Sequence, residues 1–159
     1  MAFNTKEKFM HEAVMAALKG MQNNEGGPFG CVIVKDGKII GKGNNKVTST
    51  NDPTAHAEVT AIREACKHLN SFQLDGCEIY TSCEPCPMCL GAIYWARPNK
   101  VYYGSNQLDA ANIGFDDEFI YKEILLPYDK RSISFEQLGR EIALEAFQKW
   151  SEKEDKTEY

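Results

Sequence analysis

Two short motifs constrain this chain more than any other feature: a His-Ala-Glu triplet at 56–58 and a Pro-Cys-Pro-Met-Cys run at 85–89. One histidine and a pair of cysteines suit Zn²⁺, because three protein ligands leave the fourth tetrahedral position open for water. Cys86 and Cys89 are three residues apart, so they meet on one face of a single helical turn. Glu58 is placed to take and return protons without binding the metal. The predicted zinc ligands are His56, Cys86 and Cys89.

A third thiol leaves a second kind of zinc site open. The series Cys83-x-x-Cys86-x-x-Cys89 offers three sulfur atoms beside His56, and a closed four-ligand site would hold no water and serve only a structural purpose. Three thiols at that spacing cannot all face one metal from a single short helix, however. A closed site would also leave Glu58 without a role. We therefore expect Cys83 to lie in the core or behind the ligands.

The size and composition of the chain indicate an ordinary globular protein. Its 159 residues predict a single domain spanning residues 1–159, and 43% of them are hydrophobic. No apolar run approaches the roughly 20 residues of a membrane span, and the first residues lack an apolar signal core. Three of the six cysteines crowd into residues 83–89, which indicates metal binding in a reducing compartment rather than disulfides. We expect a cytoplasmic protein with no membrane partner.

The charge balance bears on the substrate. The formal net charge is −5, whereas a protein that binds nucleic-acid phosphates needs a basic surface. A local basic patch is compatible with this net charge, but tRNA or DNA is the less favoured partner. We expect no nucleic-acid partner.

The spacing of apolar residues predicts alternating helices and strands. The predicted helices cover residues 4–20, 55–68, 87–96 and 135–150. The predicted strands cover residues 29–35, 38–44, 77–81 and 100–104, and Asp36-Gly37 joins the first two as a hairpin. This order predicts a three-layer α/β/α fold with a central mixed sheet, a parallel pair within residues 77–104, and a C-terminal helix followed by a charged tail.

Local signals add finer expectations. Gly20 is expected to end the first helix, and Thr54 is expected to cap the second one after a loop at 44–53. Gly26-Gly27 should bring the backbone close to a ligand or permit a positive φ. The apolar run that starts at Cys31 predicts a strand buried on both faces. The first helix should bury Phe9, Met10, Ala13, Val14, Ala17 and Leu18.

With these motifs the chain resembles the cytidine deaminase-like zinc-dependent superfamily, whose signature pairs His-x-Glu with Pro-Cys-x-x-Cys. Three stretches, 51–58, 80–89 and 114–121, are similar to the small bacterial guanine deaminases in particular. The resemblance covers nearly the whole chain. It implies a zinc-dependent hydrolase of purine metabolism that removes the amino group from C2 of guanine, giving xanthine and ammonia.

The resemblance also implies roles for individual residues. Zinc would be held by His56, Cys86 and Cys89, and Glu58 would shuttle protons. The base would be bonded by Asn45 and the backbone of Ala57, packed on by Phe29 and read at its edge by Asp117. A carboxylate suits that edge because guanine presents N1–H and its 2-amino group side by side as donors. Whether Asp116 joins Asp117 stays open.

The C-terminal tail has two interpretations. Residues 151–159 are charged and end on the aromatic Tyr159, so a frayed, solvated end is one possibility. The resemblance implies the other, a domain-swapped homodimer in which this segment is a lid on the partner subunit and Tyr159 enters the partner's site. A lid that excludes water would strengthen electrostatic contacts to the bound base.

Two other functions compete with a guanine deaminase. A deaminase of the same superfamily could act on guanosine or another nucleoside, on cytosine, or on tRNA adenosine. The chain could instead be a zinc-binding interaction module without catalytic activity. Zinc content without turnover of any base would indicate the interaction module.

Overall fold

The computed structural model describes residues 4–115 and 117–159. The chain divides into two compact units. The first unit runs to Glu118 and holds both predicted zinc motifs, and the second comprises Phe119–Tyr159. Each unit is described by itself.

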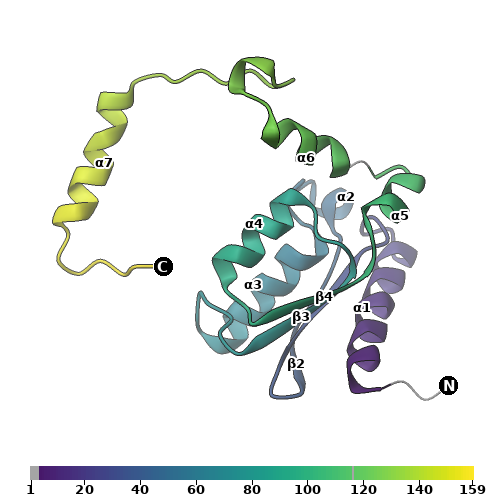
Figure 1. Ribbon diagram of the computed structural model, residues 1–159. Coiled ribbons are helices and arrows are strands. Elements are labelled where there is room, and N and C mark those ends of the chain that lie inside the picture. The colour runs from purple at the N-terminus through teal and green to yellow at the C-terminus, as the bar shows by residue number, and fades with distance from the viewer. Residues whose placement is uncertain (1–3, 116) are drawn as a thin grey trace. The chain divides into compact units, whose positions relative to one another are not determined.

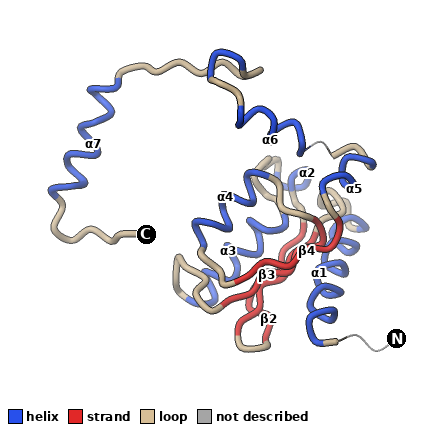
Figure 2. The backbone as a smooth tube through the Cα atoms, in the orientation of Figure 1, coloured by secondary structure: helices blue, strands red, loops and turns tan. Residues whose placement is uncertain are grey.

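A four-stranded mixed sheet forms the middle of the first unit (Figure 2). Its strands are β1 (Gly30–Lys35), β2 (Lys38–Asn44), β3 (Cys77–Cys83) and β4 (Lys100–Ser105). They lie in the order β2-β1-β3-β4, with β1 antiparallel to both neighbours and β3 parallel to β4. The predicted hairpin is confirmed, since Asp36 and Gly37 both have positive φ between β1 and β2. The buried first strand is confirmed as well, because five of its six residues are buried.

Helices cover both faces of this sheet, so the three-layer prediction is confirmed (Figure 1). Helix α1 (Thr5–Gln22) packs on one face, where Ala13 contacts a cluster with Val32 and Tyr80. Helices α3 (Ala57–Leu69) and α4 (Pro87–Ala96) pack on the other. That second cluster joins three alanines of α3 to β1, β3 and α4: Ala57, Ala61, Ala65, Ile33, Ile79 and Ile93.

The first helix differs from its prediction in two ways. Asn4 caps it, but the helix continues past Gly20, where a Cβ would lie 2.2 Å from the Asn44 amide nitrogen. Gly20 is therefore required for close packing rather than for ending the helix. Val14 and Leu18, expected inside, are 38% and 39% exposed. The buried face is narrower and built from small residues: Ala13, Ala16, Ala17 and Gly20.

The segment before α3 also corrects the sequence prediction. The expected loop contains a short helix, α2 (Val47–Thr50). Thr54 does not cap α3, because its backbone and side chain both donate to the Asp52 carboxylate. The N-cap is His56, which makes no side-chain capping bond. The predicted zinc ligand therefore occupies the helix boundary itself.

Helix α3 rests directly on strand β2 because two glycines allow it. A Cβ on Gly41 would lie 2.6 Å from the Ala61 carbonyl oxygen, and one on Gly43 would lie 2.3 Å from that of Ala57. Backbone atoms cannot move aside as a flexible side chain can, so both positions need glycine. This contact sets the height of the first turn of α3 above the sheet.

The remaining helices follow β4. Helix α5 (Gln107–Asn112) leads to α6 (Asp117–Leu125), and the second unit continues with η1 (Tyr128–Lys130) and α7 (Arg140–Glu152). The prediction of a helix from residue 135 is wrong at its start, since Gly139 is left-handed and helical structure begins at Arg140. None of residues 119–159 is buried. Within the described parts of the chain, no helix has both the length and the apolar character needed to cross a membrane.

The packing of α3 on β2 generates a stability prediction. We expect Gly43→Ala to lower the free energy of unfolding by about 1–3 kcal/mol, because the new methyl group overlaps the backbone of α3. Gly91→Ala is the matched control, since a Cβ there meets nothing within 4 Å and alanine favours the helix. Urea unfolding measures both, and equal midpoints for the two variants would contradict this account.

Candidate zinc-dependent active site

The candidate site forms where β3 ends and two helices begin. Cys83 is the last residue of β3, His56 is the N-cap of α3, and Cys86 is the N-cap of α4. Pro87 occupies the first turn of α4, as predicted, because its missing N–H costs nothing there. Helix N-termini carry partial positive charge, which favours anionic ligands such as thiolates. The fold therefore brings both motifs together from 30 residues apart.

The three predicted zinc ligands form one cluster. The His56 Nδ1 lies 3.5 Å from the Cys86 Sγ and 3.5 Å from the Cys89 Sγ, and all three ligand atoms lie within 4.8 Å of one another. Zinc at roughly 2.0–2.1 Å from nitrogen and 2.3 Å from sulfur in tetrahedral geometry would separate these atoms by about 3.6 Å. The donor set and its spacing thus fit Zn²⁺, in agreement with the sequence prediction.

The charge of the cluster also suits a cation. A hydrogen bond with the Cys89 side chain, together with His56, lowers the pKa of the Cys86 thiol to about 4. The same contact and burial raise the pKa of Cys89, so the pair shares one negative charge. The contact with Cys86 raises the pKa of His56. Coordinating thiols lose their protons, so a bound Zn²⁺ would replace the protons held by Cys86 and Cys89.

Cys83 stands apart from the cluster. Its thiol donates to the Asn106 carbonyl oxygen at 3.7 Å, and it is not among the grouped ligand atoms. Among the described residues the metal group has three members, so one coordination position is open. A structural zinc site would have four protein ligands. Cys83 is also 4% exposed, which agrees with the expectation of a buried residue outside the ligand set.

Glu58 lies beside the ligands in a nearly dry environment. It is 6% exposed, its Oε1 accepts a hydrogen bond from the Thr81 hydroxyl at 2.9 Å, and its Oε2 accepts one from the Cys89 thiol at 3.2 Å. Burial is the main reason that the pKa of Glu58 is raised. A carboxyl group with a raised pKa can both accept and release protons near neutral pH.

A pocket of about 270 Å³ opens over the cluster. It brings together six of the predicted residues: Phe29, Asn45, His56, Glu58, Cys86 and Asp117. Gly27, which the sequence suggested for a close approach to a ligand, also lines the pocket. Sequence reasoning assigned no ligand contact to the other lining residues, which are Val47, Thr48, Cys83, Glu84 and Phe115. Phe115 meets Phe29 edge to face at 4.8 Å and forms a second aromatic wall. Its position beside Asp117 in the 114–121 stretch was the signal that could have identified it.

The side-chain amide of Asn45 is held in one orientation. Its Oδ1 accepts from the backbone N–H of Gly27 at 3.3 Å and of Val47 at 3.2 Å. The oxygen is thereby occupied, so the amide nitrogen is the group available to donate to a ligand. A Cβ on Gly26 would lie 2.2 Å from this oxygen. Gly26 thus permits a close approach to Asn45, and neither Gly26 nor Gly27 has the positive φ that was one of the two expectations.

Ala57, Tyr159 and Asp116 are the remaining residues that the sequence suggested for contact with the base. Ala57 is fully buried as the first residue of α3, where its N–H has no partner within the helix. Tyr159 belongs to the second unit. Asp116 lies outside the described residues.

Comparisons with known proteins agree with this site. Residues 3–105 match the family model of the cytidine and deoxycytidylate deaminase zinc-binding region. The chain is 59% identical over 153 residues to the guanine deaminase of Bacillus subtilis (strain 168), covering 96% of this chain and 98% of that protein. It is 45% identical over 100 residues to the tRNA-specific adenosine deaminase of Aquifex aeolicus, covering 63% of this chain and 66% of that protein.

Two solved structures of guanine deaminases are also similar to this chain. The X-ray structure of the guanine deaminase from Bacillus subtilis matches with a TM-score of 0.94 and covers 96% of this chain and 98% of that one. A guanine deaminase from Nitrosomonas europaea matches with a TM-score of 0.67 at 30% identity, covering 74% of this chain and 66% of that one.

The ligand cluster generates a prediction about metal content. The purified protein should carry about one zinc per chain, as expected for three ligands and an open position. Cys86→Ser should lose most of that zinc, whereas Cys83→Ser should keep it, because Cys83 bonds to a carbonyl oxygen instead of joining the cluster. Elemental analysis of the dialysed proteins measures this. Equal loss of zinc from both variants would indicate a four-ligand site.

Proposed function

The chain belongs to the cytidine and deoxycytidylate deaminase zinc-binding family, and from that premise we propose that it hydrolyses guanine to xanthine and ammonia. The observation that most strongly supports this substrate is the 59% identity to a guanine deaminase over 96% of the chain. The family model ends at residue 105, so this match also extends through the segment that follows. The similarity to the tRNA-specific adenosine deaminase spans only 63% of the chain. The full-length likeness therefore favours the guanine substrate.

The polar groups of the pocket support the same substrate. Asn45 offers an amide donor and Asp117 a carboxylate acceptor on the lining of one cavity. Guanine presents the matching pattern, because its O6 accepts while N1–H and the 2-amino group donate. Adenine presents a donor at position 6 and an acceptor at N1, which is the reverse. Phe29 and Phe115 supply apolar walls for a flat ring.

The residues of the pocket have separate roles in the proposed reaction. Zinc held by His56, Cys86 and Cys89 supplies the Lewis acidity that makes water nucleophilic near neutral pH. Glu58 accepts a proton from the attacking water and delivers it to N3 of guanine while the water oxygen bonds to C2. Glu58 then passes the second proton to the amino group, and the C2–N bond breaks to release ammonia. The products, xanthine and ammonia, balance guanine and one water.

A homodimer with exchanged C-terminal segments completes the proposal. None of residues 119–159 is buried, and a short segment without its own core needs another surface for stability. We propose that residues 151–159 cover the pocket of the partner subunit and that Tyr159 closes it over the base. Exchange of an identical segment is a low-cost route to a symmetric dimer. The whole chain then acts as one deaminase domain, in the cytoplasm and without a nucleic-acid partner.

Release of ammonia from a panel of substrates tests the proposed activity. Guanine should be turned over faster than guanosine, adenosine, cytosine, cytidine or a tRNA stem-loop, because only guanine combines the O6, N1–H and 2-amino pattern with an N9 that carries no ribose. Glu58→Gln should keep its zinc and lose at least about 100-fold in kcat, the lower range for a general acid/base group. Preferential turnover of the stem-loop would overturn the proposed substrate. A Glu58→Gln rate near that of the wild type would exclude the proton role.

Mixing two inactive proteins tests the exchanged tail. A variant lacking residues 155–159 should be nearly inactive because it cannot close the partner's pocket. The Glu58→Gln protein should be nearly inactive because it lacks the carboxylate that transfers protons. In hybrid dimers the truncated chain keeps its Glu58 and receives an intact tail from the Glu58→Gln chain. Ammonia release should therefore reappear after subunit exchange.

The controls separate the possible roles of the tail. Each variant incubated alone shows the background rate, and size-exclusion chromatography of tagged chains confirms exchange. No recovery after confirmed exchange would exclude a tail acting on the partner. Full activity of the truncated protein would exclude a lid of any kind.

A further inference from the structure

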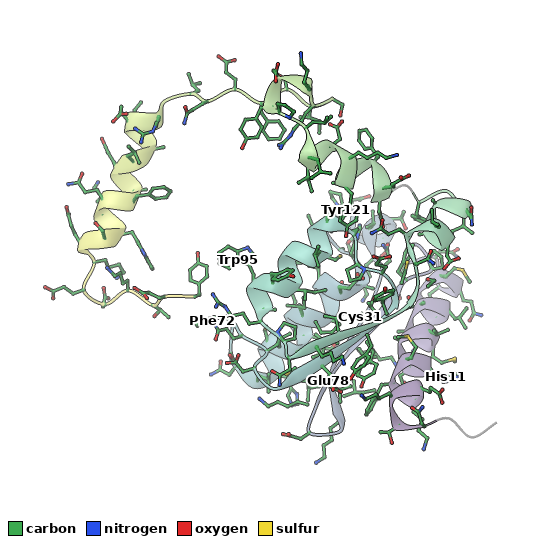
Figure 3. The ribbon with its side chains drawn as sticks, viewed as in Figure 1. His11, Cys31, Phe72, Glu78, Trp95 and Tyr121 are labelled. Atoms are coloured by element: carbon green, nitrogen blue, oxygen red, sulfur yellow. The ribbon has the colours of Figure 1, made fainter. Side chains whose placement is uncertain are left out.

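A buried hydroxyl group beside Glu58 has no part in the function described so far. Thr81 lies on β3, an interior strand of the sheet, where its register partners are Cys31 of β1 and Tyr103 of β4. It is 1% exposed. Its register partner Cys31 is labelled in Figure 3. With a paired strand on each side, the backbone of Thr81 is held firmly in place.

Its position in the strand makes the hydroxyl group unusual. Side chains alternate along β3, so Thr81 shares the face of Cys77 and Ile79, both members of the apolar cluster under α3 and α4. Burying a hydroxyl group at such a position costs free energy unless it is hydrogen-bonded. The Thr81 hydroxyl donates to the Glu58 Oε1 at 2.9 Å, across 23 residues of sequence. Valine would fill the same space without this polar group.

We propose that Thr81 is a positioning residue for the proton transfers of Glu58, an inference that rests on the deaminase activity proposed above. Thr81 holds Oε1, and Oε2 lies on the side of the metal ligands, 3.2 Å from the Cys89 Sγ. Oε2 is therefore the oxygen that exchanges protons with water and base. A glutamate has three side-chain torsions, whereas the β-branched threonine is stiff at χ1. The rigid strand thus restricts the flexible carboxylate to one orientation.

Two matched pairs of proteins isolate the hydroxyl group. Wild type and Thr81→Val differ in the hydroxyl group but hardly in shape, and Thr81→Ser and Thr81→Ala differ in the same way at smaller volume. We expect kcat for guanine to fall about 10- to 100-fold within each pair, the factor typical of a lost hydrogen bond to a charged group. KM should change less than about twofold, because Thr81 does not line the pocket. Thr81→Ser should keep most of the wild-type kcat.

The neighbouring residue supplies a control for stability alone. Tyr80 is also buried on β3, and its hydroxyl donates to the Glu78 carboxylate at 2.8 Å on the opposite face of the sheet. Glu78, labelled in Figure 3, is not among the residues that line the pocket. Tyr80→Phe removes a partly buried hydroxyl–carboxylate bond from the same strand. It should lower the unfolding midpoint but leave kcat within about twofold of the wild type.

The outcomes distinguish the inference from the proposed activity. Retention of zinc and KM, loss of kcat in Thr81→Val and Thr81→Ala, and activity in Thr81→Ser would establish the positioning role. Wild-type kcat in Thr81→Val or Thr81→Ala would overturn it. Loss of zinc in proportion to loss of kcat would also overturn it, because Thr81 would then act only on the fold. If the wild-type protein releases ammonia from no base, the proposed deaminase activity is excluded, independently of Thr81.

Discussion

The site depends on the direct contact between helix α3 and strand β2. Gly41 and Gly43 let the backbone of α3 rest on the strand, where any Cβ would overlap carbonyl oxygens of the helix. This contact fixes the first turn of α3, and with it His56 and Glu58, relative to the sheet. Helix α4 starts from the loop that leaves β3, so its cysteines arrive at the same level. The starts of α3 and α4 thereby bring three ligand atoms within 4.8 Å of one another.

The electrostatics of the cluster follow from this convergence. Both Cys86 and His56 are helix N-caps, and the Cys86 Sγ accepts from the Cys89 backbone N–H, so a thiolate also satisfies a helix end. The nearby carboxylate of Glu58 is buried in the same region, which raises its pKa and suits it to proton transfer. Metal binding and folding are coupled in such a site, since the ligands must be both deprotonated and assembled. The same packing that buries Glu58 also supplies its fixed neighbour, Thr81.

Much of the fold could be predicted because its signals are local. The Asp36-Gly37 turn, the buried run of β1 and the alternation of strands and helices each depend on residues close in sequence. The errors have separate causes, and only the first involves a residue distant in the sequence. Gly20 continues a helix because it must approach Asn44, and Thr54 loses its capping role because it bonds to Asp52 within a loop. The late start of α7 follows from the left-handed Gly139, which apolar spacing does not report.

The sequence alone predicted the three candidate zinc ligands and the carboxylate of Glu58 beside them, because these depend on spacings of two or three residues at helix starts. It also predicted the class of fold, because the order of helices and strands follows from local apolar patterns. Only the tertiary structure decided which groups complete the pocket. Phe115 joins Phe29, the amide of Asn45 is held by the backbone N–H of Gly27, and Thr81 reaches Glu58 across a strand–helix contact. Such contacts join residues far apart in the chain. Their geometry is set by how closely α3 and the loops pack on the sheet, and no local pattern encodes that distance.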